Sequence, residues 1–155
     1  MTTQDIVNYI VVNDSLSLGG QPTEEQLRAL AREGFKVVIN LATINPRYSL
    51  EDESASARGL GITYYHIPVE WGNPTEDDFE SFEKVFKQFS GKKIFLHCAA
   101  NFRASAFYTL YAQKHLGWSE EQANTLMQPI WEGSNYPIWD SFIEEMREVI
   151  KRNAV

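Results

Sequence analysis

The stretch with the clearest chemical potential runs from Lys92 to Ser105, with the sequence KKIFLHCAANFRAS. An apolar run leads into Cys98, which is the chain's only cysteine, and Arg103 follows five positions later. The pattern predicts a strand, a short turn that carries the cysteine, and a helix that starts near Arg103. Free N–H groups and the helix dipole at such a start favour the binding of an anion.

A cysteine in such a turn is a candidate nucleophile, because these surroundings lower a thiol pKa from about 8.5 to about 3.5–7.5. The guanidinium of Arg103 can hold two oxygens of a tetrahedral anion in a fixed fork. A lone cysteine after an apolar strand is also a common inert core residue. The His97-Cys98 pair, the arginine and the helix start together favour chemistry on a phosphate or another oxyanion.

These residues resemble the signature of cysteine-dependent protein phosphatases of the dual-specificity-like kind, which is His-Cys, five residues, Arg, then Ser or Thr. The resemblance is greatest to a bacterial branch that keeps only four residues between Cys and Arg. It covers about residues 15–127 and includes Gly20-Gln21-Pro22, Val37–Leu41 and Tyr65–Val69. It implies a protein tyrosine phosphatase-like fold, a phosphocysteine intermediate, and no metal or other cofactor.

The four-residue spacing between Cys98 and Arg103 has two interpretations. Either the loop has lost one residue, or it is full length and the arginine stands one place early. Ser105 lies seven residues after Cys98, where the family has its hydroxyl, and Ala104 then takes the arginine position. Asn101 falls where the family has a glycine, and Asn tolerates a left-handed backbone well. We therefore favour the full-length interpretation. It predicts a weak or altered grip of Arg103 on the anion, binding mostly through backbone N–H groups, and a low turnover for this class of enzyme.

The resemblance also implies roles for the site residues. Cys98 would attack phosphorus, and Glu70 would protonate the leaving group. Arg103 would stabilise the equatorial oxygens and Ser105 would assist release of the thiolate. His97 is expected to support the loop. The backbone N–H groups expected to bind the phosphoryl oxygens belong to Ala99, Ala100, Asn101, Phe102 and Ala104.

Alternatives exist for two of these side chains and for the function. Glu70 is equally a solvated loop carboxylate. Arg47, in the loop 42–50, is either a contact for an anionic substrate or a solvated arginine. Rhodanese-like sulfurtransferases also hold a cysteine in a strand-to-helix loop, often with four residues before an arginine, and a phosphate-binding module without turnover is a third possibility.

The bulk properties limit the class of protein. A chain of 155 residues with 43% hydrophobic residues is expected to form one domain, spanning 1–155. One cysteine indicates a reducing compartment, and the first residues resemble no leader or membrane span, so we expect a cytoplasmic protein. The net charge of −7 argues against nucleic acid as a partner. The expected partner is a phosphorylated protein or a small phosphate ester, and no membrane.

The pattern of apolar residues predicts an α/β fold with a central, mostly parallel sheet of four to five strands and helices on both faces. The strand before Cys98 is expected at its centre. Three histidines and one cysteine without ligand spacing predict no metal site. The expected strands are a hairpin over 8–18 and the segments 36–41, 62–67 and 93–97. Thr23 with Gln26, Thr75 with Asp78 and Ser119 with Gln122 have the capping pattern that starts a helix. Further helices are expected over 51–58, on the surface, and from Arg103. The last one, from Ile138, has Ile138, Phe142, Met146 and Val149 on one apolar stripe, and an aromatic loop spans 130–136.

Overall fold

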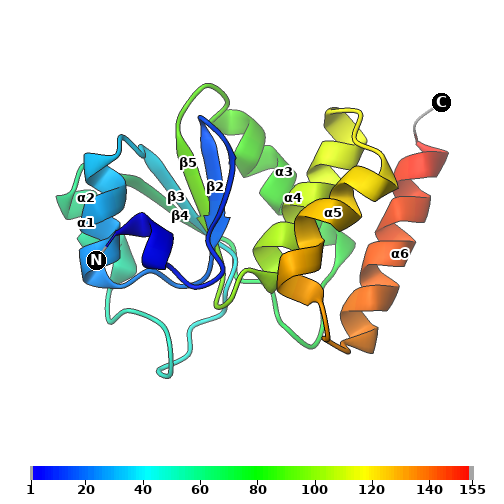
Figure 1. Cartoon of the computed structure of the whole chain (residues 1–155), viewed down its shortest axis with the longest axis horizontal. Helices are drawn as coiled ribbons and strands as arrows, with labels where there is room; N and C mark the ends of the chain where they lie inside the picture. The colour runs from blue at the N-terminus through cyan, green and yellow to red at the C-terminus, as the bar shows by residue number, and fades with distance from the viewer. Residues whose placement is uncertain (1, 154–155) are drawn as a thin grey trace.

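The computed structural model describes residues 2–153. Five strands form one sheet in the order β1-β2-β5-β3-β4, flanked by helices on both faces (Figure 1). β1 pairs with β2 in the antiparallel sense, and every other pairing is parallel. The strands are β1 (Ile10–Asn13), β2 (Leu16–Gly19), β3 (Val37–Asn40), β4 (Thr63–His66) and β5 (Ile94–His97). The prediction of a mostly parallel sheet with the cysteine strand at its centre is confirmed.

A separate apolar cluster packs against each face of the sheet. Val38 and Phe95 point to the smaller cluster, which includes residues of η1, α1 and α2 and their flanks. Ile39 and Leu96 point to the larger cluster, which includes residues of α3, α4 (Phe102–His115) and α6 (Pro137–Arg152). Because β3 and β5 are buried on both faces, their continuous apolar runs are those of central parallel strands. The first elements are η1 (Thr3–Asp5), α1 (Glu24–Arg32), α2 (Glu53–Gly59) and α3 (Glu76–Gln88).

Three helices begin with the capping boxes expected from the sequence. In α1, Thr23 accepts a hydrogen bond from the Gln26 N–H, and the Gln26 side chain accepts one from the Thr23 N–H. The same reciprocal arrangement starts α3 at Thr75 and α5 (Glu120–Trp131) at Ser119. These local contacts fix where the helices start independently of the rest of the fold.

The helices after the cysteine strand pack on the larger face. α4 (Phe102–His115) is buried along most of its length, with α5 (Glu120–Trp131) and α6 (Pro137–Arg152) against it (Figure 1). The predicted aromatic loop is shorter than expected, because α5 continues through Pro129 to Trp131. Pro129 has no N–H and so interrupts one helical bond shortly before α5 ends, and Pro137 starts α6 at a position that suits proline.

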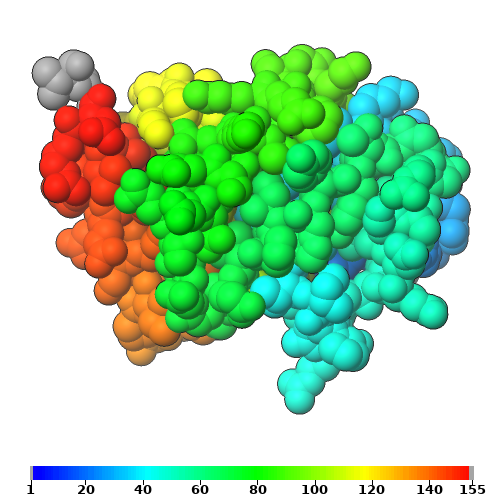
Figure 2. Space-filling model, turned by 180° about the vertical axis from the view of Figure 1, so that it is seen from behind, coloured from blue at the N-terminus to red at the C-terminus, as the bar shows by residue number. Residues whose placement is uncertain are grey.

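Two further expectations fail in detail. Ile138 was expected on the inner stripe of the last helix but is 53% exposed, and Trp139 is buried in its place. The segment 51–58 was expected as a surface helix, yet the first residue of α2, Glu53, is only 7% exposed. No helix in the described residues is long and apolar enough to cross a membrane. The loop 42–50 projects from one edge of the molecule (Figure 2).

Candidate active site

The cysteine loop, residues 98–103, starts where β5 ends. Cys98 is 1% exposed, and Asn101 takes a left-handed backbone with a φ of 74°, as its residue type predicted. The Ser105 N–H donates to the Asn101 carbonyl at 3.1 Å, within the first turn of α4. The N–H groups of Phe102, Arg103 and Ala104 precede this bond and therefore have no partner within the helix. The loop thus carries a row of free N–H donors next to the thiol.

A pair of asparagines holds the loop against the N-terminal segment. The Asn8 amide donates to the Ala100 carbonyl at 2.9 Å, and the Asn101 amide donates to the Asn8 carbonyl at 2.7 Å. Asn8 and Asn101 are also the non-glycine residues with positive φ among those described. We call this reciprocal contact the asparagine clasp. It stabilises two strained backbone positions at once.

Gly20 lets the chain before α1 approach the cysteine loop closely. The Gln21 N–H donates to the Ala99 carbonyl at 3.0 Å, and Gly20 bridges to Ala100. A Cβ atom on Gly20 would lie 2.5 Å from the Ala99 carbonyl oxygen. Only glycine fits this contact, which explains the Gly20-Gln21-Pro22 sequence in physical terms.

Arg103 is buried beside the loop that follows β4. Its Nη1 donates to the Val69 carbonyl at 3.0 Å, and its guanidinium lies 5.7 Å from the centre of the Trp71 ring. Arg103 is only 5% exposed, and its Nε has no hydrogen-bond partner among residues 2–153. Nε and Nη2 form one edge of the guanidinium fork, so a donor on that edge is available to an oxyanion.

Buried polar atoms without partners concentrate at this site. Within residues 2–153 they are Gln21 Oε1, Asn101 Oδ1 and Arg103 Nε. All three residues belong to the cysteine loop or bond directly to it. Buried polar groups are almost always satisfied in folded proteins, so such a cluster marks a place built for something other than stability.

His97 supports the loop through a buried carboxylate that sequence reasoning missed. His97 Nδ1 lies 3.0 Å from the Cys98 carbonyl, and Nε2 lies 2.6 Å from Glu53 Oε2. The Gln21 amide donates to Glu53 Oε1 at 2.8 Å. Burial alone would raise the pKa of Glu53, but the charge and hydrogen bond of His97 and the bond from Gln21 outweigh it and lower that pKa. The apolar pattern around residue 53 gave no sign of this burial.

Ser105 is fully buried, and its hydroxyl proton is engaged elsewhere. Ser105 Oγ donates to the Asn101 carbonyl at 2.7 Å and accepts from Trp131 Nε1 at 3.0 Å. A hydroxyl has a single proton to donate. The expected role of Ser105 at the thiolate therefore stays a prediction that requires its hydroxyl to rotate.

Ala104 bears on the length of the loop. It is 0% exposed and belongs to the larger apolar cluster, so a side chain at this position points into the core. A guanidinium there would be buried without partners. Arg103, by contrast, lies at the edge of the core, where it has both a carbonyl partner and a free donor. These contacts favour a loop shortened by one residue over the full-length loop that we expected.

Glu70 is exposed and lies between two anchored residues. The N–H of Val69 donates to the Leu41 carbonyl at 2.9 Å, and its carbonyl accepts from Arg103. The carbonyl of Trp71 accepts from Trp139 Nε1 at 2.7 Å. The Glu70 side chain therefore extends from a backbone segment that is hydrogen-bonded to Arg103. The side chain itself is exposed to solvent.

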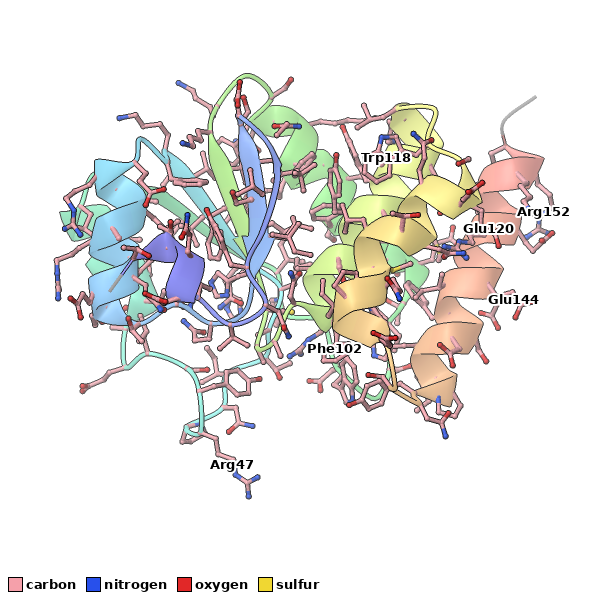
Figure 3. All side chains as sticks on the ribbon, viewed as in Figure 1. Arg47, Phe102, Trp118, Glu120, Glu144 and Arg152 are labelled. Carbon is pink, nitrogen blue, oxygen red and sulfur yellow. The ribbon has the colours of Figure 1, made fainter. Side chains whose placement is uncertain are left out.

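Arg47 does not join these residues. It is exposed at the tip of the loop 42–50 and points outward from the molecule (Figure 3). The solvated-arginine interpretation fits this position. In residues 2–153, no three His, Cys, Asp or Glu side chains gather where they could hold a metal ion.

Aromatic side chains line the cysteine loop on the side of α5 and α6. Phe102, at the start of α4 (Figure 3), lies 4.9 Å from Trp131 and 5.4 Å from Tyr136, measured between ring centres. Trp71 lies 4.9 Å from Tyr136 and 5.9 Å from Phe102. The short loop before α6 therefore packs against both the cysteine loop and the Glu70 loop, and helps to fix their separation.

Comparison with protein families gives a match over most of the chain. A family described as "DSP-PTPase phosphatase fused to NAD+ Kinase" matches residues 6–134. Among solved structures, a DUF442 protein of Shewanella putrefaciens CN-32, described as a candidate phosphatase, is 33% identical. It superposes with a TM-score of 0.87 and covers 95% of each chain.

A more distant solved structure agrees on the fold. The catalytic domain of a PP-IP phosphatase from S. cerevisiae is 14% identical, with a TM-score of 0.75 over 96% of this chain and 94% of that one.

A "Beta-lactamase hydrolase-like protein" of Xylella fastidiosa (strain Temecula1) is 31% identical over 107 residues. This match covers 67% of the chain but 25% of that relative, so the chain spans about a quarter of the relative's length.

Proposed function

The chain belongs to the family of phosphatase domains described as DSP-PTPase phosphatase fused to NAD+ kinase, and from this membership we propose that it hydrolyses phosphate monoesters through Cys98. The substrate class is a phosphorylated protein or a small phosphate ester. The chemistry needs a thiolate, a holder for the phosphoryl oxygens and a proton donor. Cys98, Arg103 with the loop N–H groups, and Glu70 supply these three parts.

The reaction has two displacements at phosphorus. In the first, the Cys98 thiolate forms an S–P bond while the P–O bond to the leaving group breaks, and Glu70 gives its proton to the departing oxygen. In the second, Glu70 as carboxylate takes a proton from a water molecule that attacks phosphorus. The S–P bond then breaks, inorganic phosphate leaves, and the thiolate returns to its starting state.

The observation that carries the proposal is the unpartnered Nε of Arg103. A donor buried in a side chain that is 5% exposed costs about 1–3 kcal/mol when it has no acceptor. A phosphoryl group on Cys98 would supply that acceptor and would also meet the free N–H groups at the start of α4. The Nη1 bond to Val69 holds the guanidinium in place before the substrate arrives.

The test is hydrolysis of a generic aryl phosphate by the wild type and by Cys98→Ser. We expect the variant to lose activity by at least about 10³-fold, because serine is not ionised at neutral pH. Circular dichroism checks that the fold persists, and Arg47→Ala, altered at an exposed position, serves as the control that retains activity. Hydrolysis retained in Cys98→Ser would refute the cysteine mechanism.

Sulfur transfer is a second candidate, favoured by the four residues between Cys98 and Arg103. The same cysteine would then accept a sulfur atom from thiosulfate and form a persulfide, with release of sulfite. Mass spectrometry of the protein after thiosulfate treatment detects that adduct. A persulfide without aryl phosphatase activity would favour this function, and oxyanion binding with neither reaction would favour a phosphate-binding module.

A further inference from the structure

The buried contact between His97 and Glu53 defines a charge state next to the nucleophile. His97 is 0% exposed and the Glu53 side chain is 6% exposed, so water does not satisfy either group. The Phe95 ring stacks on the imidazole at 5.5 Å between ring centres. The polar atoms around the ring are therefore those of the Cys98 carbonyl and the Glu53 carboxyl group.

Each of the two contacts of the imidazole requires a hydrogen between its two heavy atoms. The Cys98 carbonyl accepts only, so Nδ1 must carry a hydrogen to make its 3.0 Å contact. Nε2 and Glu53 Oε2 lie 2.6 Å apart, and two lone pairs at that distance would repel. Either Nε2 also carries a hydrogen and His97 is an imidazolium, or Glu53 is protonated.

The other contact of Glu53 favours the first arrangement. Its Oε1 accepts from the Gln21 amide at 2.8 Å, so the carboxylate has a donor at each oxygen. Hydrogen bonds from donors on both sides stabilise the ionised form. Other titratable groups around Glu53 are Tyr64, His66 and Asp52. Burial, then the charge of Glu53, raise the pKa of Tyr64 to about 12, so Tyr64 stays neutral.

We propose that Glu53 is a positioning residue that keeps His97 doubly protonated, and that this buried cation favours the thiolate of Cys98. The carboxylate lies on the far side of the imidazole from the Cys98 carbonyl. The positive end of the pair is therefore the end that contacts the backbone of Cys98. An imidazolium close to a thiol in low-dielectric surroundings favours ionisation of the thiol.

Glu53→Gln tests this charge without emptying the site. The new amide can still accept from Gln21 through its oxygen and donate from its nitrogen to Nε2 of a neutral His97. The thiolate fraction is followed by ultraviolet absorbance against pH, as the difference between each protein and its Cys98→Ser counterpart. The measurement is clean because Cys98 is the only cysteine.

The expected result is an upward shift of the ionisation midpoint by about one pH unit or more in Glu53→Gln, which is about tenfold less thiolate below it. Glu51→Gln, an exposed carboxylate two residues earlier, should keep the wild-type midpoint. An unchanged midpoint in Glu53→Gln would overturn the proposal. A lower midpoint would do so as well, since His97 would then hold its charge without Glu53.

A second measurement uses the wild-type protein and remains decisive if Glu53→Gln does not fold. Nitrogen NMR of labelled histidines distinguishes a ring with two N–H groups from a neutral ring, and His66→Gln and His115→Gln assign the His97 signals by elimination. Two protonated nitrogens at neutral pH are expected, and one bare nitrogen would overturn the proposal. Neither measurement involves substrate, so a negative result would overturn the role of Glu53 without bearing on the proposed phosphatase function. Only the effect of the thiolate on catalysis rests on that proposed function.

Discussion

At the scale of single residues, Arg103 has to serve two partners with one guanidinium. Nη1 is held by the Val69 carbonyl at 3.0 Å, which leaves the Nε edge for the phosphoryl group of the proposed reaction. Lysine carries one point of positive charge and could not divide its donors in this way. The bond to Val69 also couples the anion-binding side chain directly to the backbone that carries Glu70. The proposed oxyanion holder, Arg103, is therefore bonded to the backbone next to the proposed proton donor, Glu70.

The role of Glu70 gives a prediction at this scale. Glu70→Gln removes the transferable proton and should slow hydrolysis by about 10²–10⁴-fold for esters with poor leaving groups. Aryl phosphates whose leaving group departs as a stable anion should lose little in the first step. Steady-state kinetics over a series of substrates measures how kcat/KM depends on the pKa of the leaving group.

Asp77→Asn is the matched control, since Asp77 is an exposed carboxylate in the first turn of α3. It should leave the dependence on the leaving group unchanged. Equal losses of kcat/KM in Glu70→Gln for good and poor leaving groups would exclude Glu70 as the proton donor, because kcat/KM reports the first displacement and not the later attack of water.

At the scale of elements, the segment between β2 and α1 and the cysteine loop fit together only because Gly20 has no side chain. Gly20→Ala would place a methyl group 2.5 Å from the Ala99 carbonyl oxygen, and a backbone atom cannot move aside as a side chain can. We expect a lower melting temperature and a loss of activity larger than the loss of stability explains, because the displaced residue lies beside Cys98.

Thermal unfolding and kcat/KM measured on the same samples check this expectation. Gly59→Ala in α2 is the control, because a Cβ atom there meets nothing within 4 Å. Alanine in a helix is neutral or stabilising relative to glycine. If Gly20→Ala has the melting temperature and activity of the wild type, the close approach of the two segments is not a constraint.

The sequence predicted the helices and strands better than the contacts between residues that are far apart along the chain. Capping boxes at Thr23, Thr75 and Ser119 and the apolar run before Cys98 are local signals, and the structure has each helix or strand where they predict it. The candidate site residues Cys98 and Arg103 stand out in the sequence by their spacing. Glu53 was not, because its burial depends on His97, which lies 44 positions away along the chain.

At the scale of the whole molecule, a partly buried cluster of charged side chains ties α3 to α4. Glu83 of α3 lies 2.6 Å from His115 Nε2 and 2.9 Å from Lys114 Nζ, both in α4. Burial alone would raise the pKa of Glu83, but hydrogen bonds from His115 and Lys114 outweigh it, so its pKa is lowered from 4.5. The pKa of Glu53 is lowered in the same sense. Both carboxylates therefore stabilise the fold above pH 4.5, and this contribution is lost as the pH falls through their lowered values.

Glu83→Gln should consequently lower the free energy of unfolding at pH 7 by about 1 kcal/mol, a value reduced by the partial exposure of the pair. Its stability should also fall less than that of the wild type when the pH is lowered below 4.5. Urea unfolding at a series of pH values measures both effects. Glu80→Gln, an exposed position of the same helix, should follow the wild-type curve, and a parallel curve for Glu83→Gln would contradict the argument.

The asparagine clasp has a consequence for how the protein folds. Its two hydrogen bonds join positions that are 92 and 93 residues apart, so they close one of the longest loops in the chain. Contacts of such separation form late, after the intervening strands and helices have come together. The cysteine loop can therefore take its final backbone only near the end of folding. During refolding, the native environment of Cys98 should appear together with the slowest phase, after most of the helix signal has returned.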